Sequence, residues 1–444
     1  MDINKIILAI NDVVWGWPLI IFIAFVSLAT TVMLYGIQFR YFFKSWRLLL
    51  SSQDEGAAAD ADMTPFQSFV NALSTSIGNG SIAGVATAVY AGGPGTAFWI
   101  FVFGIFGMAL RFAEVFLSSY YITEGGTGTS LGGPMIYLKN VPGNYILPAI
   151  YALFCLFLAF SSGNAMQANS IRIGLERILP LSPLVIACIL LAFIMYVMLG
   201  GAERIVKASD ALVPVKVGGF FLSALIILSY HYQSLFPALK TILVGAFTPQ
   251  ALAGGVFGYT VLHAIRFGIV RGVNASEAGL GIAGVLFGGS GSKNAMQNGI
   301  FSMVGEFISA NLVCFFVALM LVASGVWSNG QTSINLTISA YETVFGYIGG
   351  WIVTFLSIAF GIGVLVSYAY VGRACWIYLT KGKFLNIFTL LYCVITFLGA
   401  LASVEVVWNA TDLVNAGLLI TNLFGILWLL PMIQKRVHAY LHAA

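Results

Sequence analysis

The sequence predicts an all-α polytopic membrane protein with about eleven transmembrane helices. Of its 444 residues, 59% are hydrophobic and only 8% are charged, whereas roughly a quarter of the residues of a soluble protein are charged. The mean hydropathy is +0.95. The apolar stretches run for about the 20 residues that one helical crossing needs and do not alternate over about ten residues, which excludes a membrane β-barrel.

Polar residues, glycines and prolines divide the apolar sequence into successive spans. The first run follows acidic residues and is long enough to cross a membrane, so it is expected to remain as a helix and not to be cleaved as a signal peptide. The predicted spans are 18–37, 65–90, 96–121, 146–168, 183–200, 209–230, 252–273, 299–324, 349–376, 385–404 and 411–433.

Basic residues predict the orientation. With these spans, thirteen of the twenty Lys and Arg residues fall on one side and four on the other, and the richer side is normally cytoplasmic. We therefore expect a bacterial inner-membrane protein with its N-terminus outside and its C-terminus in the cytoplasm. The net charge of +4 reflects this bias and gives no reason to expect a nucleic-acid partner.

The five cysteines show no paired spacing and lie in or beside hydrophobic runs. Neither a disulfide framework nor a zinc site is predicted, and we expect no cofactor.

The second span contains the segment 75–81 (TSIGNGS), where two glycines and four polar side chains weaken a helix at mid-depth. Non-helical backbone survives there only if it is buried in protein or lines a cavity. A broken helix presents amide N–H groups to a substrate carboxylate and carbonyl groups to a cation, whereas the alternative is close helix packing through Gly80 and Gly84. The residues expected to contact a substrate are Thr75, Gly78, Asn79, Gly80 and Ser81.

A second interruption is predicted in span seven, at Gly254, Gly255 and Gly258 and the following 263–268 (HAIRFG). Two interrupted segments five spans apart imply two five-helix repeats of opposite orientation with a site between them. The expected divisions are a first helix with an acidic linker (1–64), two repeats (65–235 and 236–434) and a cytoplasmic tail (435–444).

Further polar and aromatic residues are candidates for the same site. Gln167 is expected to contact the substrate, whereas Asn164 suits helix–helix hydrogen bonding equally well. Phe267, beside Gly268, and Tyr368 are expected to form opposite walls of a small pocket, with routine packing as the alternative.

Charged residues within the spans are expected to form structural pairs or gates. Arg111 and Glu114 are three residues apart on one helix and are expected to pair, and Arg266 is expected to meet Glu306. Arg271 and Glu277, near the cytoplasmic end of span seven, are expected to form a network that closes a gate, with a substrate contact as the alternative. The positions are read from the sequence.

Several motifs together resemble the alanine or glycine:cation symporter family. The most specific are 92–99 (GGPGTAFW), 106–114 (FGMALRFAE) and 277–281 (EAGLG), and the resemblance covers about residues 65–430. It implies a leucine-transporter type of fold, one extra N-terminal helix, and sodium-coupled transport of a small neutral amino acid by alternating access. Where such symporters typically have Gly-Thr-Gly-Asn in the first broken helix, this chain has Gly-Asn-Gly-Ser at 78–81, which leaves the exact substrate open.

The resemblance weakens at the sodium site. It implies two hydroxyl ligands at positions 363 and 364, where this chain has Gly363 and Val364. Lys216 lies in a span at a position that is normally apolar, and a buried ammonium costs about 3 kcal/mol on insertion scales. In proton-coupled carriers of the same general fold, a lysine on the equivalent helix takes the sodium position. We therefore predict that the Lys216 amine occupies the vacated site and couples transport by gaining and losing a proton; the alternative is that the amine reaches water at the cytoplasmic end.

Other classes of function find less support. No G-x-x-x-x-G-K-[ST] loop and no H-E-x-x-H motif occurs, so an ATP-driven pump and an enzyme are disfavoured. Sodium-coupled symport and an amino acid-binding sensor remain alternatives to a proton-coupled importer of alanine or glycine. The protein is expected to be a monomer or a weak oligomer in the lipid bilayer.

Overall fold

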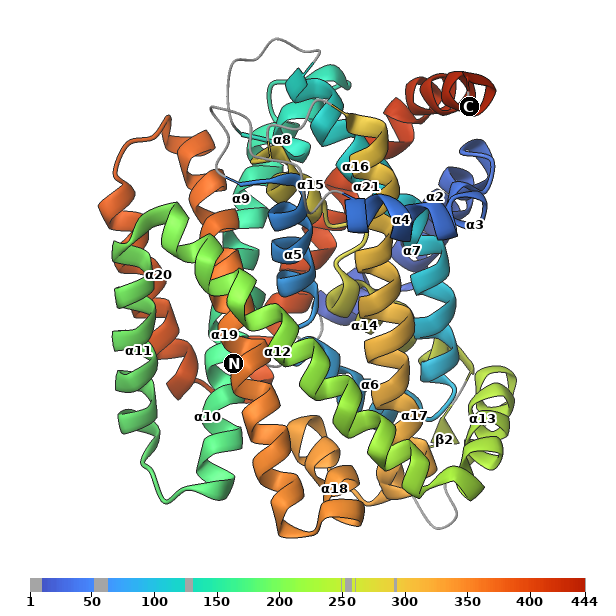
Figure 1. The fold of residues 1–444 in the computed structure, drawn as a ribbon, viewed down its shortest axis with the longest axis vertical. Coiled ribbons are helices and arrows are strands. Elements are labelled where there is room, and N and C mark those ends of the chain that lie inside the picture. The colour runs from blue at the N-terminus through green and yellow to red at the C-terminus, as the bar shows by residue number, and fades with distance from the viewer. Residues whose placement is uncertain are drawn as a thin grey trace.

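A computed structural model describes residues 10–51, 63–123, 131–248, 250–251, 258–259, 261–290 and 294–443. Within these residues the chain is a bundle of helices, many of them lying along the long axis of the molecule (Figure 1). In the described part of the chain, six helices are long and apolar enough to cross a membrane: Thr96–Ile122, Leu147–Ile178, Leu212–Tyr230, Ala295–Ala323, Tyr347–Thr380 and Thr411–His442. The prediction of an all-helical polytopic membrane protein is confirmed.

Four shorter apolar helices, at Trp17–Met33, Gly80–Gly92, Pro183–Leu199 and Leu385–Leu401, coincide with further predicted spans. The α-helices are α2 (Trp17–Met33), α3 (Ile37–Arg40), α4 (Phe42–Ser51), α5 (Pro65–Ser76), α6 (Val85–Gly92), α7 (Thr96–Thr123), α8 (Pro134–Tyr137), α9 (Leu147–Phe160), α10 (Met166–Ile178), α11 (Pro183–Leu199), α12 (Gly201–Tyr230), α13 (Tyr232–Phe247), α14 (Val261–Ser276), α15 (Ile282–Gly288), α16 (Ala295–Glu306), α17 (Phe315–Ala323), α18 (Ser333–Phe345), α19 (Tyr347–Thr380), α20 (Leu385–Leu401) and α21 (Val404–Ala443).

Three π-helical segments interrupt or join these helices: η2 (Gly80–Gly84), η4 (Ser161–Ala165) and η5 (Phe307–Cys314). Two 3₁₀ turns are η3 (Leu138–Asn140) and η6 (Val326–Ser328). The strands β1 (Gln250–Ala251) and β2 (Gly258–Tyr259) form a short antiparallel ladder. Strand β1 and the helices α13 and α18 lie in connections between predicted spans, whereas β2 lies within the predicted span 252–273.

The first predicted break is present. Thr64 caps α5 with a capping box, and Pro65 begins the helix, since proline has no N–H to lose at that position. Helix α5 ends at Ser76, and the chain resumes as η2 at Gly80 and then as α6.

The second break is not where the sequence placed it. Residues 252–257, which include Gly254 and Gly255, lie outside the described residues, and α14 runs without interruption through His263, Arg266 and Gly268. The interruption instead follows Ser276, because Glu277, Gly279 and Gly281 all have positive φ angles of 63°, 88° and 80°. Helix α15 begins only after this turn.

The packing brings the two breaks together. Helix α7 packs against α14, α15 and α16, and α19 packs against α5, α9, α10 and α12. The two half-helices α5 and α14 lie near the centre of the bundle in Figure 1, and α5 packs against α15 across the breaks.

Candidate functional site

The first break exposes main-chain carbonyl groups inside the protein. Ile77 leaves the helical conformation with φ −99° and ψ 83°, and Gly78 follows without a side chain. A Cβ on Gly78 would lie 2.6 Å from Cγ2 of Val364, so a larger residue would not fit without displacing α19. The segment therefore depends on glycine to bring its backbone against α19.

The Lys216 amine occupies this break. Its Nζ atom donates hydrogen bonds to the main-chain oxygens of Ser74 and Ile77, each at 2.9 Å, and lies 3.3 Å from the Ser74 hydroxyl. The side chain is fully buried. It does not extend to water at the end of α12, which was the alternative interpretation.

Gly363 provides the space for the amine. A Cβ at this position would lie 2.8 Å from Nζ of Lys216 and 3.0 Å from Oγ of Ser74. Val364 is also buried and contributes only methyl groups. The positions where the family resemblance implies hydroxyl ligands thus hold no side-chain oxygen, and one of them is left empty for the ammonium group.

Asn79 and Gln167 form the other side of the first break. The Asn79 N–H donates to Oε1 of Gln167 at 3.1 Å, while the Asn79 side chain exchanges hydrogen bonds with Ser357 at 2.8 and 3.2 Å. The Asn79 amide therefore ties the break to α19. Gln167 Nε2 donates to the Ser162 carbonyl at 2.9 Å, inside the π-helical segment η4.

Glu277 lies at the start of the second break and faces the first. Thr75 Oγ1 donates to Oε2 of Glu277 at 2.7 Å, and the Tyr368 hydroxyl donates to Oε1. All three side chains are buried, with Glu277 only 3% exposed. The two break segments are therefore joined through a carboxylate and two hydroxyl groups that come from α5 and α19.

Buried polar side chains hold the second break in its turn. Oε1 of Glu114 accepts the Gly281 N–H at 2.9 Å and Nδ2 of Asn422 at 2.8 Å. Ser309 Oγ donates to the main-chain oxygens of Ala275, at 2.9 Å, and Ser76, at 3.2 Å. Carbonyl groups at the end of a helix lack partners within that helix. Ser309 supplies a hydroxyl group to the carbonyl ends of both interrupted helices and so connects them.

Ser81, Phe267 and Gly268 also make contacts within the protein. The Ser81 hydroxyl donates back to the Ser76 carbonyl at 3.3 Å, within the break. Gly268 packs against Trp99, to whose Cβ an added Cβ would come within 2.4 Å, and Phe267 lies against Gly92. The structure therefore brings Thr75, Gly78–Ser81, Gln167 and Tyr368 together, whereas Phe267 packs against the end of α6 and Gly268 against the start of α7.

The charged pairs differ from the expected ones. Arg111 pairs with Glu306 at 3.4 Å and not with Glu114, and Arg266 pairs with Asp12 at 2.6 Å and not with Glu306. Both predictions were wrong, because spacing along one helix does not reveal partners on other helices.

Arg271 and Glu277 are engaged in different contacts. Arg271 donates to both carboxylate oxygens of Asp412 at 3.3 Å, while Glu277 accepts from Thr75 and Tyr368. The gating role of either residue stays a prediction.

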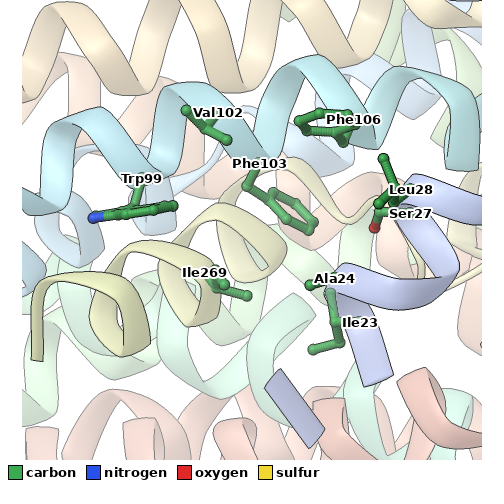
Figure 2. Close-up of a pocket in the computed structure, with 9 residues that line it drawn as sticks. All are labelled: Ile23, Ala24, Ser27, Leu28, Trp99, Val102, Phe103, Phe106 and Ile269. Carbon is green, nitrogen blue, oxygen red and sulfur yellow. The ribbon is translucent and has the colours of Figure 1, made fainter. Parts of the chain in front are cut away.

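Among the described residues, one cavity lies beside α5 and another lies between α2, α7 and α14. One, of about 550 Å³, is lined by α4, α5 and α12 and reaches Leu73 and Pro214, neighbours in sequence of Ser74 and Lys216. The other, of about 220 Å³, is lined by apolar residues of α2, α7 and α14, with Ser27 as the polar exception (Figure 2). It lies beside Trp99 and Ile269 and contains none of the break residues.

Sequence reasoning missed several residues of this site, namely Ser74, Ser309, Ser357 and Asn422. Serines and asparagines commonly form hydrogen bonds within apolar helices. Nothing in the sequence distinguishes these four residues from the other serines and asparagines of the chain. Glu277 was recognised only as a gate candidate.

Comparison with known proteins agrees with this architecture. The sequence model of the "Sodium:alanine symporter family" matches residues 1–444. An uncharacterized transporter of Haemophilus influenzae is 32% identical over 99% of this chain and 96% of its own. The "Sodium/alanine symporter AgcS" of Methanococcus maripaludis is also 32% identical, over 99% of this chain and 98% of its own.

Among solved structures, a Na⁺-coupled sialic acid symporter in a substrate-bound outward-open state matches with a TM-score of 0.53 and 12% identity, covering 91% of this chain and 85% of the other. At this identity the likeness concerns the fold alone. The full-length match of sequence shows that this chain belongs to the sodium:alanine symporter family, and hence to the cation-coupled amino acid symporters.

Proposed function

We propose that the protein imports a small neutral amino acid, alanine or glycine, by alternating access, and that a proton carried by Lys216 takes the place of a coupling sodium ion. The substrate site lies between the breaks at 77–79 and 277–281. The two breaks belong to inverted five-helix repeats, 65–235 and 236–434, which follow a first helix and linker (1–64) and precede a cytoplasmic tail (435–444). The N-terminus lies outside.

The backbone of the breaks supports the substrate class. The described residues around them offer peptide groups and short hydroxyl and amide side chains, among them Thr75, Ser81 and Gln167. A zwitterion of this size needs N–H donors for its carboxylate and oxygen acceptors for its ammonium group, which interrupted helices provide.

One observation carries the proposal for the coupling ion: the Lys216 amine donates to the main-chain oxygens of Ser74 and Ile77. Sodium binds through a cage of oxygen atoms, and these two carbonyl groups already hold an ammonium. A second cation 4 Å from that ammonium would be repelled by about 4 kcal/mol at an effective dielectric constant of 20. With the amine protonated, sodium is therefore excluded from this position.

Protonation and deprotonation of Lys216 would then replace sodium binding and release as the coupling steps of transport. The protonated amine bonds to both carbonyl groups and holds α5 against α12, whereas the neutral amine has fewer donors and no charge. The cavity of about 550 Å³ that reaches Leu73 and Pro214 offers a route for the proton toward the face that carries α4.

Sodium-coupled alanine or glycine symport is the second candidate. It is favoured by the full-length similarity to the sodium/alanine symporter of Methanococcus maripaludis. In that case sodium would bind at a position other than the Lys216 contact, since that contact is already occupied by a cation.

Counterflow in proteoliposomes tests the proposal. A panel of small amino acids is measured with and without sodium and across a pH series, in the wild type and in Lys216→Met. We expect exchange of alanine or glycine that ignores sodium and follows pH, and loss of the pH response in the variant. Exchange that requires sodium and is indifferent to pH would reject proton coupling, and equilibrium binding without exchange would indicate a sensor.

A further inference from the structure

Residues 10–15, called here the N-terminal segment, contact the helix that precedes the second break. Asp12 forms an ion pair with Arg266 of α14 at 2.6 Å. Trp15 is only 2% exposed, and its Nε1–H donates to the main-chain oxygen of Asp412 at 2.9 Å. The extra N-terminal part of the chain is thus bonded to both α14 and α21.

Asp412 is the centre of these contacts. Its carboxylate accepts from both terminal nitrogens of Arg271 at 3.3 Å and from Nδ2 of Asn274 at 2.6 Å. Asn274 in turn accepts from Asn415 at 2.6 Å. Arg271 and Asn274 both belong to α14, so one carboxylate of α21 holds two consecutive turns of that helix.

The same turns of α14 contact the first break. The main-chain oxygen of Asn274 lies 3.5 Å from where a Cβ of Gly80 would be. A displacement of α14 away from α21 would therefore uncover the first break, and it would have to separate the Asp412 contacts and release the N-terminal segment.

We propose that Asp12 and Trp15 are positioning residues for transport: they latch α14 against α21 and keep the substrate site closed toward the face that carries the N-terminal segment. This inference rests on the proposed function and assigns a role to the part of the chain that precedes the first repeat. Arg266 and Asp412 are the two points to which the latch is fastened.

The latch predicts a particular kinetic change. In the proposed orientation this face is the outer one, so that a weaker latch favours the open state that receives the amino acid. The apparent affinity for a ligand rises when its binding-competent state becomes more populated, while closure and turnover become slower. Loss of one hydrogen bond of ordinary strength corresponds to about a fivefold change in that equilibrium.

The test is uptake of labelled alanine and glycine by cells that express the full-length protein. Trp15→Phe removes the indole N–H and keeps an aromatic ring, and Asp12→Asn removes a charge from a side chain that is 69% exposed. We expect each variant to lower KM severalfold, to at most about fivefold for Trp15→Phe, and to lower the maximal rate. The exchanged pair Asp12→Arg with Arg266→Asp should return KM and rate toward the wild type.

Glu176→Gln is the matched control, because the Arg172–Glu176 pair lies within the single helix α10 and should leave both constants unchanged. Unchanged KM in Asp12→Asn and Trp15→Phe, a loss of rate with KM unaltered, or an exchanged pair that fails to recover would each overturn the latch. If Trp15→Phe fails to fold, the KM and maximal rate of the exchanged pair Asp12→Arg with Arg266→Asp test the latch without it. A wild type that takes up neither amino acid contradicts the proposed function instead.

Discussion

The contact of Lys216 with the first break depends on the absence of a side chain at Gly363. An amine on α12 reaches two carbonyl groups of α5 because α19 has a glycine beside it. The family resemblance predicted this meeting, because the chain has a lysine within an apolar span and lacks the two hydroxyl groups that the resemblance implies at positions 363 and 364. It could not predict Ser74 as the third contact, since nothing in the sequence distinguishes that serine from its neighbours.

Gly363→Ala should displace the amine. The new Cβ would lie 2.8 Å from Nζ of Lys216, and hydrogen bonds of a charged donor contribute about 1.5–3 kcal/mol each. We expect uptake to fall at least tenfold and its pH response to weaken. Gly218→Ala, which has open space on the same helix as Lys216, is the control and should transport normally; equal activity of the two variants would contradict the assigned contact.

Replacing the Lys216 ammonium by hydroxyl ligands at positions 363 and 364 should convert proton coupling into sodium coupling. Lys216→Ala removes the ammonium, and Gly363→Ser with Val364→Thr adds two hydroxyl groups near the carbonyl groups of Ser74 and Ile77. We expect the triple variant to show sodium-dependent uptake, measured in a sodium titration at fixed pH, while Lys216→Ala alone shows neither sodium nor pH dependence. A triple variant indistinguishable from Lys216→Ala would argue against a shared cation position.

At the scale of elements, the sequence revealed one break and misplaced the other. Glycines and polar residues in the middle of the 65–90 run marked the first, because a continuous helix would leave them unsatisfied in hydrocarbon. The second break, at 277–281, resembled a loop after span seven. Its positive φ at Glu277 is stabilised by Thr75 and Tyr368, which are distant in sequence.

The ion pairs between different helices could not be predicted from the sequence either. Arg271 meets Asp412 across 141 positions, and Arg266 meets Asp12 across 254. Periodicity places a charge on a helix, but the partner depends on how the helices pack.

The second break should be intolerant of a side chain at Gly281. Its φ of +80° disfavours other residues, and a Cβ would lie 2.3 Å from Cγ of Pro134. The backbone cost is about 1–2 kcal/mol, and overpacking adds about 1–3 kcal/mol. Gly281→Ala should therefore lower the melting temperature of the purified protein and its uptake.

Gly325→Ala separates the backbone cost from the packing cost. Gly325 has a similar φ of +76°, but no atom lies within 4 Å of an added Cβ. It should lower the melting temperature less than Gly281→Ala. Equal losses in the two variants would mean that packing against Pro134 contributes nothing.

For the whole molecule, the two breaks interrupt helices at the centre of the bundle. Helices α5 and α14 each end at the centre, and the contacts between them run through single side chains such as Ser309 and Glu277. Few bonds must therefore be exchanged when one half-helix tilts. This agrees with alternating access by movement of half-helices around a fixed site.

Accumulation driven by an imposed gradient tests directly whether Lys216 couples transport to protons. Proteoliposomes that enclose a pH indicator are given either a proton gradient or a sodium gradient, and labelled alanine or glycine is followed together with internal pH. We expect the proton gradient alone to drive accumulation, with internal acidification that Lys216→Met abolishes. Accumulation driven only by sodium, without movement of protons, would contradict this coupling.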